Sequence, residues 1–207
     1  MLAWYARHRR QLPWRGIRDP YAVLVSEIML QQTQVARVVE FYPRFLQRYP
    51  TLEDLASAPA HEVRESWEGL GYYARARNLH AAVRRIAAES GGRVPRSPTE
   101  LRRLPGIGTY TAGAVSSLAF GAAVPAVDTN VARVLGRAFG LRGAARSARR
   151  TRRMWALAAA LVPAGRAADW NQALMDLGAL VCTARAPRCP VCPVRGICAV
   201  RARTERC

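Results

Sequence analysis

The chain has 207 residues, and 32 basic side chains against 14 acidic ones give it a formal net charge of +18. All 32 basic residues are arginine, since lysine does not occur in the sequence. Hydrophobic residues make up 50% of the chain, which excludes a disordered protein of low hydrophobicity. So large an arginine excess on a folded core predicts a polyanionic partner, and nucleic acid is the commonest polyanion.

Residues 1–14 mix arginine with tryptophan and lack the apolar segment of a secretory signal. No run in the sequence approaches the roughly 18 apolar residues that a membrane span needs. We therefore expect a protein that is neither secreted nor bound to a membrane, and that acts in the cytoplasm in association with the nucleoid.

Apolar residues recur at helical spacing through most of the chain, which predicts an all-α protein. Asp19 and Pro20 have the pattern of a helix start, with a capping residue before a proline at the first helical position. Ser97 and Glu100 have the spacing of a reciprocal capping box. The arginine-rich stretch 142–153 is interpreted as a solvated connector between helices. Further helices are predicted at 51–57, 60–69, 73–90, 109–120, 129–139, 151–162 and 168–181.

Glu27 belongs to the helix that Pro20 begins, on the same face as Val23, Leu24 and Ile28. A carboxyl group beside an apolar stripe is partly desolvated, which raises its pKa toward that of a general acid near neutral pH. The alternative is a glutamate that pairs with one of the many arginines. On spacing alone the ion pair is the commoner arrangement.

The segment Leu104–Gly108 lies between two predicted helices. Its two glycines, Gly106 and Gly108, let the chain reverse tightly while Ile107 anchors the turn. This helix-hairpin-helix pattern presents backbone N–H groups that bind a phosphate without reading base sequence. An ordinary hairpin of two helices has the same pattern, and the net charge favours DNA binding.

Asp128 ends an extended segment and directly precedes the helix that begins near Asn130. One interpretation is a simple helix N-cap. The other is a carboxylate that stays ionised at a helix N-terminus and faces a developing cation. The two roles are compatible.

The five cysteines all lie within the last 26 residues, which does not fit a disulfide framework spread over a secreted fold. Four of them are separated by six, two and five residues, namely Cys182, Cys189, Cys192 and Cys198. From this spacing a four-thiolate zinc site and a [4Fe-4S] cluster both fit. Cys207 is expected to be a free thiol without a function.

Together these segments resemble one family, the helix-hairpin-helix, Gly/Pro-Asp DNA glycosylases, and within it the adenine glycosylases of the MutY type. The hairpin and Asp128 mark the superfamily. Narrower matches to adenine glycosylases are the runs SEIMLQQTQV at 26–35 and GLGYYARARNL at 69–79. The remaining matching segments are 12–15, 128–130 and 171–178.

The resemblance implies an enzyme that flips an adenine, mispaired with guanine or 8-oxoguanine, out of double-stranded DNA into a pocket between two helical domains. Glu27 would protonate N7 of the adenine, and ionised Asp128 would stabilise the oxocarbenium ion. Tyr110 stands where relatives with AP-lyase activity carry a Schiff-base lysine. Because the chain has no lysine, we expect a monofunctional glycosylase without lysine-dependent AP-lyase activity.

The same resemblance implies roles for further residues. Asn130 would position the catalytic groups, and Gln32 and Tyr72 would wedge into the opened duplex. The adenine pocket would contain Trp14, Arg15, Leu30 and Gln172. Phosphate contacts are expected from Gly106, Gly108 and Thr111 at the hairpin. Further phosphate contacts are expected from Arg185 and Arg188 in the segment 182–198, which we call the cysteine loop. The four clustered cysteines would hold a structural [4Fe-4S] cluster.

For the domains, the resemblance implies a six-helix domain with the hairpin at 18–125. A second helical lobe would combine 1–17 with 126–207 and carry the cysteine cluster at 182–198. We expect a monomer. The chain departs from the family pattern at Thr129, where glycine is usual. It also ends nine residues after Cys198, where many relatives carry a domain that recognises 8-oxoguanine.

Two other functions stay open at this point. One is a mismatch-specific thymine or uracil DNA glycosylase of the same fold, which would need no protonation at N7. The other is a DNA-binding damage sensor without catalytic activity, although binding alone requires none of Glu27, Asp128 and Tyr110.

Overall fold

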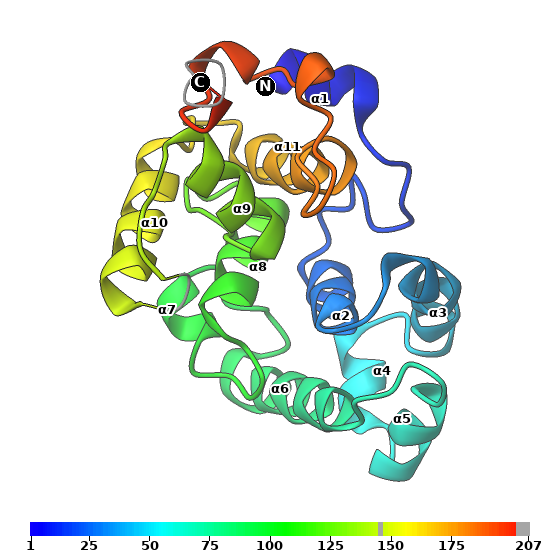
Figure 1. Cartoon of the computed structure of the whole chain (residues 1–207). Helices are drawn as coiled ribbons and strands as arrows, with labels where there is room; N and C mark the ends of the chain where they lie inside the picture. Colours follow the sequence, from blue (N-terminus) through cyan, green and yellow to red (C-terminus); the bar gives the residue numbers. More distant parts are fainter. Residues whose placement is uncertain (145–146, 202–207) are drawn as a thin grey trace. The chain divides into compact units, whose positions relative to one another are not determined.

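The computed structural model describes residues 1–144 and 147–201 (Figure 1). These residues form eleven α-helices and two short 3₁₀ helices and contain no strand, which confirms the all-α prediction. The chain divides into two compact units. We call Gln11–Phe120 the hairpin unit, and Met1–Arg10 together with Gly121–Cys207 the cysteine unit. The boundaries expected from the sequence, at 17/18 and 125/126, lie a few residues after the observed boundaries at 10/11 and 120/121.

The hairpin unit contains seven helices, because a single turn, α7, adds to the six expected. Helix α2 packs against α3 and α8, and α6 packs against α4 and α5. The core includes Leu24, Val25 and Met29, all fully buried on α2. The helices are α2 (Pro20–Leu30), α3 (Val35–Arg48), α4 (Leu52–Ser57), α5 (Ala60–Ser66), α6 (Ala74–Ser90), α7 (Pro98–Leu101) and α8 (Thr109–Phe120).

The cysteine unit is built around α11, which packs against α1 and α9, while α10 packs against α9. Arg10 Nε lies 2.7 Å from Oδ1 of the fully buried Asp176, so an ion pair ties the segment after α1 to α11. Across the described residues, no helix is long and apolar enough to cross a membrane. The elements are α1 (Leu2–His8), α9 (Thr129–Ala138), α10 (Ala148–Ala160), α11 (Ala167–Leu180), η1 (Cys189–Val191) and η2 (Arg195–Ile197).

The N-termini of the helices confirm one of the two predicted capping patterns. Asp19 accepts hydrogen bonds from the first backbone N–H groups of α2, with Pro20 at the first helical position, as predicted. The box predicted at Ser97 is wrong, because Ser97 accepts from the N–H of Thr99 and α7 is only one turn long. The reciprocal box occurs instead at Thr51 and Asp54, at the start of α4.

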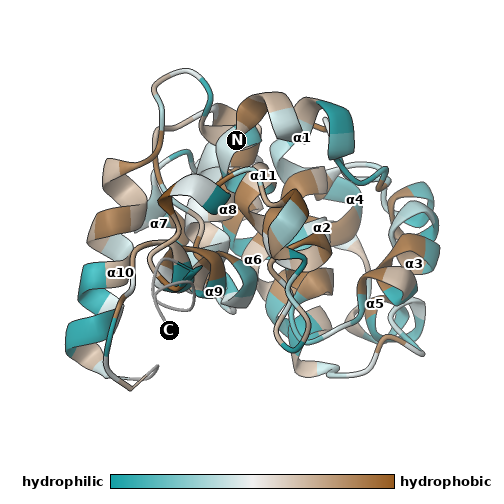
Figure 2. Cartoon of the chain, turned by 45° about the horizontal axis from the view of Figure 1, so that its top comes forward, coloured by the Kyte–Doolittle hydropathy of each residue, from teal (hydrophilic) through white to brown (hydrophobic). Residues whose placement is uncertain are grey.

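The prediction of a solvated connector over 142–153 is wrong for its second half. Ser147 caps α10 by accepting a hydrogen bond from the backbone N–H of Arg150, so the helix begins at Ala148. Figure 2 shows the result, a helix whose first turns are hydrophilic and whose later turns are hydrophobic. Helices α1 and α3 are not among the predicted elements. Helix α3 has no side-chain cap and contains Pro43, and it therefore lacks the usual signals in the sequence.

Candidate functional site

Glu27 lies in the most deeply buried helix of the hairpin unit. Its side chain is 3% exposed, and eight of its ten neighbours on α2 are buried too. The helix begins at a strong cap and is apolar around its circumference, so it places this carboxyl group away from bulk water. That environment suits a group that holds a proton until a substrate base arrives.

The hairpin at 104–108 uses its two glycines differently. Gly106 has a φ of +74°, and a Cβ atom there would lie 2.7 Å from Cβ of Asn78. Gly108 has ordinary backbone geometry, and a Cβ atom there would meet nothing within 4 Å. Only Gly106 is therefore needed for the turn, while Gly108 leaves open space at the start of α8. Ile107 is buried and anchors the turn.

The first turn of α8 carries Tyr110 and Thr111. Tyr110 is half-buried. Thr111 is 2% exposed, and its Oγ1 accepts a hydrogen bond from Nε2 of Gln31 at 3.2 Å. The side chain of Thr111 therefore faces the interior, and any contact of this residue with DNA would be made by its backbone. Gln31 Nε2 also approaches the carbonyl of Gly106 at 3.4 Å, which connects the end of α2 to the hairpin.

Gln32 and Tyr72 share a rare backbone conformation. They are the two non-glycine residues with positive φ among residues 1–144 and 147–201, at 57° and 50°. Such a conformation costs about 1–3 kcal/mol at each residue and persists only where the surroundings impose it. Both side chains are exposed, with Tyr72 at 60%. The structure thus presents both expected wedge residues on short loops of the hairpin unit.

The residues expected in the adenine pocket come from both units. In the hairpin unit, Trp14 is buried and packs edge-on against Tyr42, with ring centroids 5.6 Å apart. Arg15 and Leu30 are half-buried. In the cysteine unit, Gln172 on α11 accepts a hydrogen bond from the hydroxyl of Tyr5 at 2.5 Å.

Asp128 is the N-cap of α9. One carboxylate oxygen, Oδ1, accepts a hydrogen bond from the backbone N–H of Val131 at 2.7 Å, and Oδ2 accepts from Nδ2 of Asn130 at 2.9 Å. An ionised carboxylate accepts on both oxygens in this way, and the helix N-terminus favours its negative charge. The cap and the anion predicted from the sequence are therefore compatible at one side chain.

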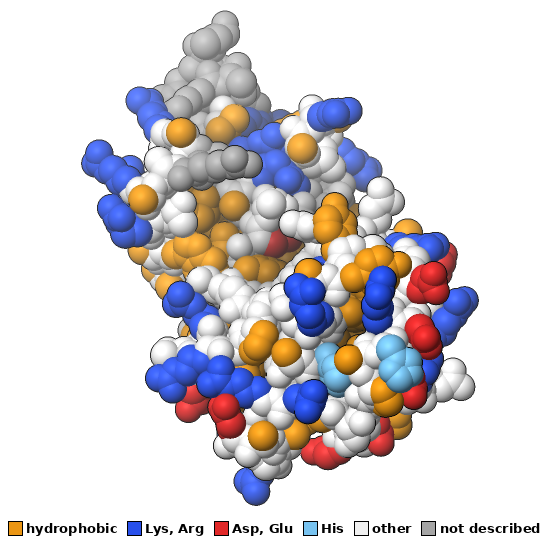
Figure 3. Space-filling model, turned by 90° about the horizontal axis from the view of Figure 1, so that it is seen from below, with side chains coloured by type: hydrophobic (Ala, Val, Ile, Leu, Met, Phe, Trp, Pro, Cys, Tyr) orange, Lys and Arg blue, Asp and Glu red, His pale blue; other side chains and the backbone are white. Residues whose placement is uncertain are grey.

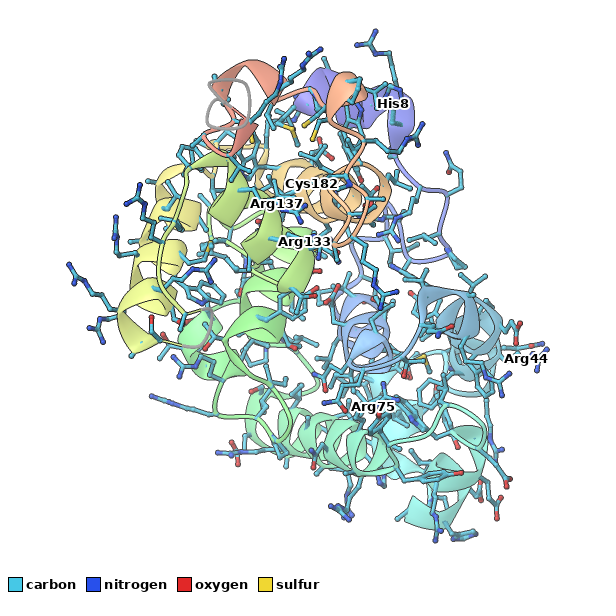
Figure 4. The ribbon with its side chains drawn as sticks, in the orientation of Figure 1. His8, Arg44, Arg75, Arg133, Arg137 and Cys182 are labelled. Atoms are coloured by element: carbon cyan, nitrogen blue, oxygen red, sulfur yellow. The ribbon has the colours of Figure 1, made fainter. Side chains whose placement is uncertain are left out.

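Arg133 joins this cap to the beginning of the cysteine loop, and the sequence analysis missed it. Its Nη2 donates to Oδ1 of Asn130 and to the carbonyl of Gly178, both at 2.7 Å. Its Nε donates to the carbonyl of Cys182 at 2.8 Å. The only signal in the sequence is its position three residues after Asn130, on the same face of α9. Figure 4 shows Arg133 and Arg137 on α9, close to Cys182.

The four clustered cysteines line one cavity of about 500 Å³ in the cysteine unit. All four are free thiols. Arg137 holds the loop that begins at Cys182, because its guanidinium donates to the carbonyls of Thr183 at 2.7 Å and Ala184 at 2.9 Å. The same guanidinium donates from Nη1 to Sγ of Cys182 at 3.4 Å.

The thiols lie close enough to influence one another. Burial raises the pKa of the Cys192 thiol, and its three neighbours in the cluster raise it further. In the part of the chain that the structure describes, no three His, Cys, Asp or Glu side chains are arranged to hold a metal ion. The four thiols therefore line the cavity without converging on a position for a single metal ion. Arg185 and Arg188 on the loop are exposed, and Cys207 lies outside the described residues.

Three comparisons relate the chain to known proteins. It is 47% identical to the adenine DNA glycosylase of Homo sapiens, with a match that covers 100% of this chain and 39% of the human protein. It is also 47% identical to the adenine DNA glycosylase of Mycolicibacterium smegmatis, over 94% of this chain and 66% of that protein. The chain therefore spans less than half the length of the human relative.

Among solved structures, the fold resembles that of a thermostable thymine-DNA glycosylase. The TM-score is 0.89 at 36% sequence identity, and the match covers 100% of this chain and 94% of that chain. A family model described as HhH-GPD superfamily base excision DNA repair protein matches residues 25–159, which include Glu27, the hairpin and Asp128. The chain belongs to the HhH-GPD superfamily of base excision DNA repair proteins.

Proposed function

We propose that the chain is a monofunctional DNA glycosylase that removes adenine mispaired with guanine or 8-oxoguanine. The observation that carries the proposal is Glu27, a carboxyl group 3% exposed on a helix whose other buried residues are hydrophobic except for Ser26. Two relatives at 47% identity that bear the name adenine DNA glycosylase support the same base. The enzyme would act as a monomer on double-stranded DNA, in the cytoplasm at the nucleoid.

In the reaction, the proton of Glu27 passes to N7 of adenine. The bond between C1′ of the sugar and N9 of the base then breaks, its electron pair leaves with the neutral base, and positive charge develops on the sugar. Asp128 provides the negative charge that stabilises this oxocarbenium ion, and Asn130 orients it through a hydrogen bond of 2.9 Å. Water adds to C1′ and loses a proton, which leaves an abasic site.

The absence of lysine supports hydrolysis without strand cleavage. A lyase of this fold attacks C1′ with a lysine amine, and this sequence contains no lysine. By the resemblance, Tyr110 in the first turn of α8 would stand where such a lyase has its lysine. We therefore expect strand breaks at the product only after alkali is added.

DNA contacts would come from several exposed features. The open space at Gly108 lets a phosphate approach the N-terminus of α8, and Gln32 and Tyr72 project from short loops. Arg185 and Arg188 on the cysteine loop are exposed and suit further phosphates. The adenine would be recognised by Trp14, Arg15, Leu30 and Gln172.

We also propose that Cys182, Cys189, Cys192 and Cys198 hold a [4Fe-4S] cluster. The thiolates of such a cluster each bind a different iron, so they stand farther apart than four thiolates around one zinc ion. A cavity of about 500 Å³ lined by all four free thiols fits the cluster in this respect. The cluster would fix the cysteine loop, and no step of the reaction passes through it. Iron, zinc and acid-labile sulfide analysis of the purified protein distinguishes the two groups.

A second candidate is a mismatch-specific thymine or uracil glycosylase. The similarity to a thermostable thymine-DNA glycosylase, at 36% identity over the full chain, favours it. Thymine and uracil have no N7, so this activity would not need the buried proton of Glu27. The role of Glu27 therefore separates the two candidates.

The test is a single-turnover excision assay on four duplexes that contain A opposite 8-oxoguanine, A opposite G, T opposite G and U opposite G. We expect cleavage at A after alkali, and its loss in both Glu27→Gln and Asp128→Asn. Excision confined to T or U, and retained in Glu27→Gln, would assign the chain to the second candidate. Tight binding without excision on any of the four duplexes would favour a DNA-binding damage sensor without catalytic activity.

A further inference from the structure

Arg75 is a buried cation near the start of α6, outside the residues assigned so far. Its side chain is 7% exposed, and Figure 4 shows it where α6 meets the end of α2. Burial lowers the pKa of Arg75, with a smaller opposing effect from Tyr72. Among the described residues no carboxylate forms an ion pair with Arg75, and its charge is instead solvated by neutral acceptors.

These acceptors belong to two separate segments. Nη1 donates to the carbonyls of Ile28 at 3.1 Å and Met29 at 2.6 Å, in the last turn of α2, and Nη2 donates to Oγ1 of Thr33 at 2.7 Å. Nη2 also donates to the carbonyls of Leu70 at 3.3 Å and Gly71 at 3.0 Å. One guanidinium therefore joins the segment 28–33 to the segment 70–71.

Each of these segments carries or adjoins one of the two strained residues. Gln32 lies between Met29 and Thr33, and Tyr72 directly follows Gly71. The guanidinium carbon also lies 5.4 Å from the ring centroid of Tyr72. It also lies over the ring of the fully buried Trp67, 5.5 Å from the ring centroid, and Trp67 Nε1 donates to the carbonyl of Gly71 at 3.2 Å.

We propose that Arg75 is a positioning residue that fixes the loops of Gln32 and Tyr72 to one rigid frame, so that both side chains enter the duplex together. Five acceptors on the segments 28–33 and 70–71 cannot shift independently while a planar guanidinium joins them. This role rests on the proposed function, because it assumes that Gln32 and Tyr72 open the duplex. The inference adds that Arg75 sets the distance between the side chains of Gln32 and Tyr72.

Lysine at this position would keep the positive charge but not the planar fork. Its ammonium group donates from one point and cannot reach acceptors on both segments in the same geometry. Thr33→Val is a milder change, because it removes only the hydroxyl that accepts from Nη2 while keeping the shape of the side chain. Arg75→Lys thus removes most of the hydrogen bonds between the two segments, and Thr33→Val removes one of them. Arg84→Lys, on the exposed face of α6, is the matched control.

The experiment measures duplex opening by the fluorescence of 2-aminopurine placed at the target adenine, with protein at saturation. A displaced wedge lowers the amplitude, so we expect a loss of about threefold or more in Arg75→Lys, a smaller loss in Thr33→Val, and none in Arg84→Lys. Single-turnover excision should fall by about tenfold in Arg75→Lys on a fully paired duplex. The fall should be smaller where flanking mismatches already weaken the duplex, a difference that general loss of folded protein would not produce.

Gln32→Ala and Tyr72→Ala separate this inference from the proposed function. If both leave the fluorescence amplitude unchanged, the wedge roles are wrong whatever Arg75 does. If both lower it while Arg75→Lys and Thr33→Val melt and open DNA like the parent protein, the positioning role of Arg75 is overturned. Should Arg75→Lys fail to fold, Thr33→Val decides alone.

Discussion

A single substitution separates the helix cap at Asp128 from the catalytic anion proposed for the same side chain. Asparagine caps helices as well as aspartate does, and its Oδ1 can still accept the hydrogen bond from the N–H of Val131. We therefore predict that Asp128→Asn changes the free energy of unfolding by no more than about 0.5 kcal/mol, while excision falls by at least about 100-fold because the anion is gone. Thermal unfolding and single-turnover kinetics check the two parts.

Asp128→Ala provides the comparison. It removes the cap as well as the charge and should cost about 1 kcal/mol in stability. If the two variants were equally stable, the cap would contribute nothing. If Asp128→Asn retained full activity, the carboxylate would not be needed in the reaction.

Glu27→Gln tests whether the carboxyl group of Glu27 acts as the proposed general acid. Glutamine nearly matches glutamate in shape and therefore keeps the packing of α2, but it cannot give up a proton to N7. We predict a loss of about 10²- to 10⁴-fold in single-turnover adenine excision, with binding to an uncleavable duplex unchanged. Ser26→Ala, on the adjacent buried position, is a control for general disturbance of the helix. Equal losses in both variants would point to packing rather than to acid catalysis.

The sequence predicts such residues unequally well. Glu27 and Asp128 are visible because a carboxylate on an apolar face, or before a helix, is chemically distinctive. Arg75 and Arg133 could not be predicted, since each donates to two carbonyl groups that lie 45 to 49 residues away in the chain. A backbone acceptor leaves no trace in side-chain identity.

At the scale of elements, the contact between α9 and α11 depends on one missing side chain. A Cβ atom at Gly178 would lie 2.6 Å from Cβ of Asn130 and 3.1 Å from its backbone, which cannot move aside cheaply. We predict that Gly178→Ala separates the two helices, lowers the free energy of unfolding by about 1–3 kcal/mol, and reduces excision by displacing Asn130 and Asp128.

Gly196→Ala is its control, because a Cβ atom there would meet nothing within 4 Å. Chemical denaturation and the excision assay measure both variants. A Gly178→Ala variant as stable and active as Gly196→Ala would show that α9 and α11 adjust without effect on Asp128.

The helices themselves were predictable where a cap and an apolar face coincide, as in α2 and α9. Helix α3 escaped prediction because Pro43 interrupts it and Gln34 makes no side-chain cap. The start of α10 escaped for a different reason, since four arginines after Ser147 suggest solvent rather than structure. Helix α3 therefore depends on tertiary packing, and the start of α10 depends on the hydroxyl of Ser147, which caps it.

Across the whole molecule, the positive charge is unevenly shared. The cysteine unit has 18 arginines against four acidic residues, and the hairpin unit has 14 arginines against ten acidic residues. Figure 3, seen from the side where α4, α5 and α6 lie, shows acidic side chains among the arginines. Most of the uncompensated charge, +14 of +18, therefore belongs to the cysteine unit.

This charge predicts a strongly salt-dependent affinity for DNA. If about six phosphates are neutralised, the logarithm of the association constant falls with the logarithm of salt concentration at a slope near −5. Between 50 and 200 mM salt, binding to an undamaged duplex should weaken by about 1,000-fold. Fluorescence anisotropy at four salt concentrations measures the slope. A slope near zero would mean that the arginine excess serves another partner.

At the scale of the whole chain, the cysteine loop carries two exposed arginines and the proposed ligands of the cluster. The apolar side chains of Val191 and Ile197 in the loop are exposed rather than packed. The loop is tied to α9 by Arg137, and directly after it the backbone N–H of Ala199 donates to the carbonyl of Ala138 at 2.8 Å. A bound cluster would add its binding free energy to the folded state. Cys198→Ser should therefore lower iron and sulfide content, and proteases should cut the cysteine unit before the hairpin unit.

Cys207→Ser is the matched control, because Cys207 is outside the proposed ligand set. It should retain the parent's iron, sulfide and resistance to proteolysis. Loss of iron in Cys198→Ser without faster cleavage of the cysteine unit would mean that the protein contacts alone hold the loop. Full iron content in Cys198→Ser would remove Cys198 from the ligand set. The expected pattern, with iron and protease resistance lost together, would make the cluster a structural support for the loop that carries Arg185 and Arg188.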